Sequence, residues 1–72
     1  MSNSDKNQEL HRQLILLMAK HSLCLTKVGR EVNYQRQAIN YHLHLIQDKT
    51  GLDPRSFYDL CELLEYIKEG KL

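Results

Sequence analysis

Residues 26–43, TKVGREVNYQRQAINYHL, decide how this chain folds. Two short helices that cross steeply need a small residue in the first helix, an apolar residue before the turn, a turn residue, and an apolar residue midway along the second helix. Those places hold Gly29, Val32, Asn33 and Ile39. Asn tolerates the left-handed backbone that a sharp turn between helices requires. The stretch therefore predicts a helix-turn-helix unit over about residues 26–46.

The two helices of this unit carry apolar residues at helical spacing. We expect the first to open after Thr26, a residue type that caps helices well. The second is predicted over about 35–47, with a stop at Lys49-Thr50-Gly51 and with Ile46 on its inward face. The predicted core of the unit is Val28, Gly29, Val32, Asn33, Ala38, Ile39 and Leu43. The polar residues of the second helix fall on its other side.

A further helix is predicted before this unit. It starts near Ser4 or Asp5, because Asp5 and Gln8 fit a capping box. It ends around residues 20–22. Its predicted apolar stripe is Leu10, Leu14, Leu17, Met18 and His21.

A closing helix is predicted over about residues 54–68. Asp53 is the expected cap, and Pro54 is expected in the first helical position, where its missing amide costs nothing. The predicted buried stripe of this helix is Phe57, Leu60, Cys61, Leu64 and Ile67, with Tyr58 and Tyr66 beside it. No apolar/polar alternation typical of strands occurs. The sequence thus predicts an all-α fold, a single helix-turn-helix domain over 1–72 with four to five short helices.

Length and composition limit the class of protein. Seventy-two residues leave room for one small domain. No apolar run approaches the roughly 20 residues that span a bilayer, and the start, MSNSDKNQEL, lacks the basic-then-apolar order of a signal peptide. We therefore expect a cytoplasmic protein that does not engage a membrane. The two cysteines, Cys24 and Cys61, are too few and too far apart for a disulfide framework and are expected in the core.

The charge is unevenly distributed although the net charge is only +1. Residues 20–49 carry five Lys or Arg against two acids, and residues 50–72 carry three against five. A mildly basic middle is therefore followed by an acidic end. Phosphate contacts supply most non-specific affinity for DNA, so a lone copy with so few cations would bind DNA weakly.

Taken together, residues 10–64 resemble the Cro/repressor-type helix-turn-helix family of small phage and bacterial regulators. Asn33 stands where that family usually has glycine, Gln35 where Ser or Thr usually caps, and Gly29 where alanine is usual. Within it, the chain is similar to the modulators of repression, the anti-repressors of temperate phages of Gram-positive hosts. The resemblance implies a bacterial host cell and a protein that binds the N-terminal DNA-binding domain of the phage repressor. Its binding would alter operator occupancy in the lysis–lysogeny decision of the genetic switch.

The polar face of the second helix supplies the candidate binding residues. Gln and Asn can pair with adenine edges and Arg with guanine or phosphate, whereas Tyr and Arg are also favoured in protein interfaces. The candidates are Lys27, Arg30, Gln35, Arg36, Gln37, Asn40, Tyr41 and His44. A Cro-type homodimer that reads operator DNA with these residues is the alternative, and an adaptor domain without a nucleic-acid role is a third. The apolar residues expected to be exposed, and so available for a dimer or partner surface, are Leu45, Leu63, Tyr66 and Leu72.

Enzymatic and metal sites are not indicated. His42 and His44 are two residues apart, so on a helix they point about 200° from each other and cannot chelate one ion. No glycine-rich phosphate loop occurs in the chain. We expect no catalytic role, no metal, no cofactor and no small-molecule ligand.

Overall fold

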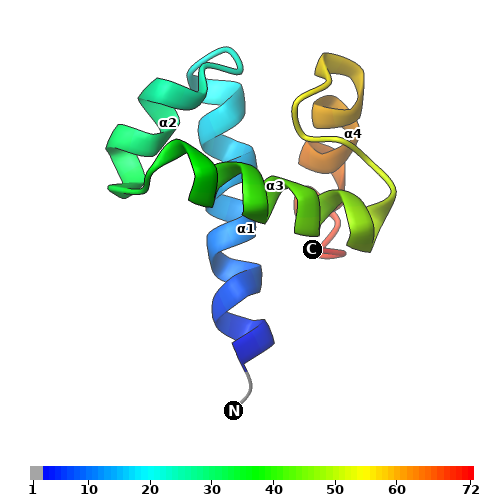
Figure 1. Ribbon diagram of the computed structural model, residues 1–72. Coiled ribbons are helices and arrows are strands. Elements are labelled where there is room, and N and C mark those ends of the chain that lie inside the picture. Colours follow the sequence, from blue (N-terminus) through cyan, green and yellow to red (C-terminus); the bar gives the residue numbers. More distant parts are fainter. Residues whose placement is uncertain (1–2) are drawn as a thin grey trace.

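The computed structural model describes residues 3–72, with side chains from Gln8 onward. In this part of the chain it contains α1 (Asn3–Lys20), α2 (Leu25–Val32), α3 (Arg36–Thr50) and α4 (Phe57–Lys68), and no strand. Figure 1 shows α3 crossing in front of the long α1, with α2 on one side and α4 on the other. The all-α fold with four helices is thereby confirmed.

The core lies where α3 and α4 pack on α1. α3 buries the face that its apolar spacing predicts, and this face packs against α1. The buried apolar side chains are Leu14, Ile15, Met18, Val28, Ile39, Leu43, Ile46, Leu60, Leu63 and Leu72. Each such side chain stabilises the fold by about 1.5–3 kcal/mol relative to exposure. This core fixes the direction in which the opposite, polar face of α3 points.

The α2–α3 turn has the geometry that the sequence predicts. Asn33 adopts the left-handed conformation (φ 58°, ψ 42°) directly after α2. The Tyr34 N–H donates to the Gly29 carbonyl over 2.9 Å. A Cβ on Gly29 would stand 2.8 Å from the Tyr34 carbonyl oxygen, so even alanine is crowded there. The turn therefore explains why glycine occupies this place.

α1 begins at Asn3, close to the expected start at Ser4 or Asp5, and the side chain of the proposed cap Asp5 lies outside the described ones. Two of the other expected helix starts are wrong. α2 begins at Leu25 with Cys24 as N-cap, so Thr26 lies inside the helix. The second is the start of the closing helix, which does not begin at Pro54.

Pro54 precedes α4 instead of opening it. Asp53 Oδ1 accepts hydrogen bonds from the Arg55 backbone N–H and from Arg55 Nε, both over 3.0 Å. These bonds close a turn over residues 53–56, and α4 starts after it with Ser56 as N-cap. Asp53 therefore caps the turn and not the helix.

α3 also differs from its expected bounds. Gln35 is its N-cap and makes no side-chain capping bond, and the helix continues past Gln47 to Thr50. Gly51, at φ 77°, ends it in the left-handed conformation, as expected of the stop at this place.

The predictions of which apolar residues are exposed were largely wrong. Leu63 and Leu72 are buried, and Leu45 and Tyr66 are half-buried. Gly70, at φ 75°, turns the chain after α4 so that Leu72 reaches the core. In contrast, two members of the expected buried stripe, Phe57 and Cys61, are exposed, and Cys24 is half-buried.

Candidate recognition face on α2 and α3

The structure places the polar candidates of α3 on one face of the helix, opposite its buried residues. Arg36, Gln37, Tyr41 and His44 are exposed, and Asn40 is half-buried. Gln35 is exposed at the N-cap. Tyr41 leaves 60% of its surface open. We call this set, with Lys27 and Arg30 of α2, the recognition face.

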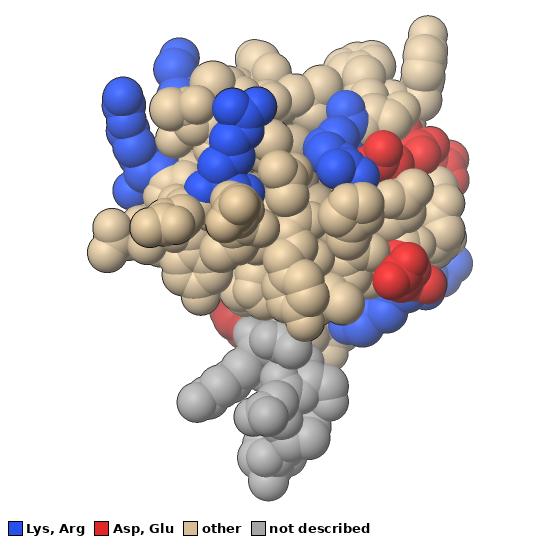
Figure 2. Space-filling view, viewed as in Figure 1, with Lys and Arg blue, Asp and Glu red and all other residues tan. Residues whose placement is uncertain are grey.

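The two helices of the recognition face meet in a shallow hollow of about 300 Å³. Arg30 and Arg36 both line it, one from each helix. Between them lie the turn residues Asn33 and Tyr34. Because a guanidinium presents several N–H donors in a fixed plane, a pair of them suits a phosphate or a carboxylate. Figure 2 shows several Lys and Arg side chains over the α2 side of this view, whereas on the α4 side Lys or Arg and Asp or Glu lie beside one another.

The cations of the recognition face have no carboxylate partner among the described side chains. Glu31, the acid that α2 contributes, instead pairs with the end of α1, at 3.3 Å from Lys20 Nζ and 3.5 Å from His21 Nε2. The hydrogen bond and positive charge of Lys20 hold the pKa of Glu31 below its usual range. Lys27, Arg30 and Arg36 therefore keep their charge available for a partner.

Tyr34 also belongs to this surface, although it is not among the binding residues that the sequence predicts. Its side chain is 40% exposed and lines the hollow between Arg30 and Arg36. Its position in the sequence could have indicated this, because Tyr34 directly follows the turn residue Asn33 and turns lie at the surface.

A pair of histidines supports the recognition face from beneath. His42 lies edge-on to Tyr41, with ring centroids 5.2 Å apart, and tilted to Tyr34 at 6.0 Å. On its inner side, His42 Nδ1 is 3.2 Å from Nε2 of His11, a residue of α1 that is only 1% exposed. One ring must donate to the other, and that requires the accepting nitrogen to be unprotonated. The pair thus links the core to the two exposed tyrosines.

Both histidines of this pair favour the neutral form. Burial, with smaller contributions from the positive charges of Lys49 and His42, lowers the pKa of His11 to about 4. Burial also lowers the pKa of His42. The rings therefore act at neutral pH as a hydrogen-bonded packing element. His42 and His44 point to different environments, since His42 is half-buried against α1 and His44 is exposed.

In the described part of the chain, no three His, Cys, Asp or Glu side chains converge as metal ligands would. None of the described helices has the length and apolar character needed to cross a membrane. Comparison with known proteins yields no matching family model, no matching curated protein and no matching solved structure.

Proposed function

We propose that the chain is an anti-repressor of a phage genetic switch, a modulator of repression that acts in the cytoplasm of a bacterial host. Its recognition face would bind the N-terminal DNA-binding domain of the phage repressor and alter how that domain occupies its operator. The observation that carries the proposal is the polar surface of α2 and α3, where Arg30 and Arg36 line one hollow and Tyr41 and Gln37 are exposed on α3.

The chemistry of this face supports a protein partner. Exposed Tyr and Arg are the side chains most enriched among residues that dominate binding energy, and Tyr41 stands 60% open with His42 packed against its ring. Amides such as Gln37 and Asn40 add hydrogen-bonding capacity without a charge that must be paired. The resemblance to Cro/repressor-type proteins, which rests on the α2–turn–α3 unit, supports the choice of partner.

A Cro-type repressor that reads operator DNA as a homodimer is the second candidate. The observation in its favour is that Lys27, Arg30 and Arg36 have no ion pair with a described carboxylate. Three phosphate contacts per copy give a salt slope of about −3 on logarithmic axes, because each contributes about −0.9. Direct DNA binding by this face would therefore weaken steeply as salt is added.

A gel shift on the operator DNA next to the gene of this protein distinguishes an anti-repressor from a Cro-type repressor. The protein is applied alone and then together with the neighbouring repressor. An anti-repressor leaves the DNA unshifted when alone and changes the repressor–DNA pattern when both are present. A clean, salt-sensitive shift by the protein alone would instead establish the Cro-type function.

Arg36→Ala provides the matching test of the face, with Lys68→Ala as a control that removes an exposed cation from α4. We expect Arg36→Ala to abolish the effect on the repressor and Lys68→Ala to retain it, with circular dichroism confirming equal helicity. Equal activity of both variants would remove Arg36, and with it this face, from the proposal.

A further inference from the structure

One edge of α4 carries an apolar stripe that the fold covers only in part. Phe57, Cys61 and Leu64 follow each other at helical spacing, and the sequence predicts all of them as buried. In the structure Leu60 is buried and Leu64 is half-buried against the core, whereas Phe57 is 63% exposed and Cys61 is exposed. Tyr58, 81% exposed, lies edge-on to Phe57 with ring centroids 5.7 Å apart. The apolar face of α4 is thus wider than the core that covers it.

This edge forms one wall of an apolar groove. The groove has a volume of about 350 Å³ and runs between α4 and the end of α1. The buried Met18 and Leu60 line it together with Leu23 and Phe57.

The opposite wall of the groove is held in place by a strained turn. Ser22 and Leu23 both adopt left-handed φ values, 54° and 68°, where glycine is usual. The Leu23 N–H donates to the Met18 carbonyl over 2.7 Å. Non-glycine residues in this region cost of order 1 kcal/mol or more and are over-represented at binding sites. The turn therefore fixes Leu23 at the groove.

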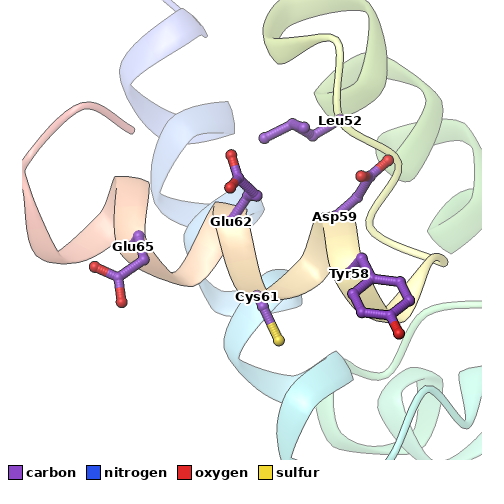
Figure 3. A pocket seen from close by; sticks show the side chains of 6 residues that line it. All are labelled: Leu52, Tyr58, Asp59, Cys61, Glu62 and Glu65. Carbon is purple, nitrogen blue, oxygen red and sulfur yellow. The ribbon is translucent and has the colours of Figure 1, made fainter.

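Acidic side chains border the apolar edge on its other side. A second hollow, of about 560 Å³, lies along α4 and is lined by Tyr58, Cys61, Glu62 and Glu65 among others. Figure 3 shows these side chains projecting from successive turns of α4, with Asp59 and Leu52 beside Glu62. Asp59 is engaged by the Asp53 N–H. Glu62 and Glu65 are exposed and form no ion pair with a described side chain.

We infer that this edge of α4, with its groove and acidic border, is a docking site for a basic amphipathic helix of another protein. A helix laid in a groove binds through apolar anchors spaced at i, i+3, i+4 and i+7. Phe57 and Leu23 would enclose such anchors, and Glu62 and Glu65 would pair with Lys or Arg at the border. The site shares no residue with the recognition face.

Charge complementarity selects this occupant over others. A second copy docking its own α4 symmetrically would bring Glu62 and Glu65 against the same carboxylates, and opposed like charges are unfavourable. The same acids repel nucleic acid. A basic amphipathic helix can place its apolar side chains in the groove and its Lys or Arg side chains next to Glu62 and Glu65.

The test is a titration of the ¹⁵N-labelled full chain with two designed 14-residue helical peptides. Both carry Leu at i, i+3, i+4 and i+7; one has Lys at the flanking positions and the other has Glu. We expect the Lys peptide to shift the amide resonances of Leu23, Phe57 and Cys61, and the Glu peptide to bind at least tenfold more weakly. The paired substitution Glu62→Lys and Glu65→Lys should reverse this preference.

A matched pair of variants tests the apolar part. Phe57→Ser should weaken binding of the Lys peptide at least tenfold, whereas Leu16→Ser, which alters an apolar residue of α1 with 50% exposure, should leave it unchanged. Both residues are exposed, so circular dichroism should report folded protein for each. Arg36→Ala should not alter peptide binding, which keeps the outcome separate from that of the proposed function.

Three results would overturn the inference. The first is equal affinity for the Lys and Glu peptides, and the second is no binding or a set of shifts centred on α3. The third is a dimer in sedimentation that Phe57→Ser abolishes, because it would assign the edge to a second copy of the chain.

Discussion

At the scale of single residues, Gly29 is the position on which the α2–α3 turn depends most. The Tyr34 carbonyl oxygen would stand 2.8 Å from a Cβ at this place. It is backbone, and it belongs to the residue that also donates to Gly29. The crowding therefore cannot be relieved by a side-chain rotation.

We expect Gly29→Ala to destabilise the fold by about 1–3 kcal/mol, the usual cost of overpacking a tight site. This cost would outweigh the gain of about 1 kcal/mol that alanine brings to a helix interior. Urea denaturation measures the difference. Thr26→Ala, an exposed change in the same helix, is the control and should stay within about 0.5 kcal/mol of the wild type. A Gly29→Ala variant as stable as the wild type would show that the turn relaxes.

The His11–His42 pair predicts how stability depends on pH. The unfolded chain protonates His11 near pH 6.5, whereas the folded protein does so at about pH 4. Between these values the unfolded state binds more protons, so the free energy of unfolding falls as the pH is lowered from 6.5 to 4. The full shift corresponds to about 3 kcal/mol. The lowered pKa of His42 acts in the same direction.

Urea unfolding at several pH values between 7 and 5 checks this dependence. That window lies above the range in which Glu31 and Asp53, whose pKa values are lowered, add their own acid destabilisation. His11→Leu should make the free energy of unfolding depend less on pH, because it removes the buried group whose pKa is lowered to about 4. A curve of unchanged slope in this variant would assign the dependence to other groups.

At the scale of the elements, the sequence was sufficient for the number of helices and for the α2–α3 turn. Asn33 and Gly51 adopt a left-handed backbone that few residues tolerate, and Gly29 leaves room for the Tyr34 carbonyl, so each can be interpreted from its local sequence. Helix starts were less predictable. Asp53 and Pro54 suit a helix N-terminus, yet Arg55 binds the Asp53 carboxylate and closes a separate turn. The spacing of apolar residues does not reveal that Arg55, and not the start of the helix, takes up the Asp53 carboxylate.

The faces of the helices depended on tertiary packing in the same way. α1 buries His11, Leu14, Ile15 and Met18, which share one helical stripe, whereas Leu10 and Leu17 are half-buried. The predicted stripe has His21 as its polar member and omits His11, whose partner His42 lies 31 residues further along the chain, in α3. In contrast, the polar face of α3 could be predicted from the spacing of apolar residues within α3 alone. Its residues are exposed or half-buried, and what they bind remains a proposal.

At the scale of the whole molecule, the chain after α4 completes the core. Leu72 is 6% exposed and belongs to the same buried cluster as Leu14 and Leu63. A 72-residue domain has little core to spare. We expect Leu72→Ser to cost about 2 kcal/mol, the value of one buried leucine. Thermal unfolding checks this, with Lys68→Ala as the exposed control; equal melting temperatures would show that Leu72 adds nothing.

The two proposed surfaces differ in charge. Among the described side chains, Lys27, Arg30 and Arg36 on α2 and the start of α3 form no ion pair, and neither do Glu62 and Glu65 on α4, which also carries the exposed Lys68. The two proposals assign these regions to different partners: the recognition face to a repressor domain, and the edge of α4 to a basic helix. Each can fail without the other, because their residues do not overlap.

The most direct test of the central claim is the affinity of the full chain for the isolated DNA-binding domain of the neighbouring repressor, measured by titration calorimetry. The double variant Arg36→Ala, Tyr41→Ala is compared with Lys68→Ala. Loss of two interface anchors at more than about 1 kcal/mol each should weaken the first at least tenfold and leave the second unchanged, both with native helicity. Equal affinity of the double variant and the wild type would contradict the claim that the recognition face binds the repressor.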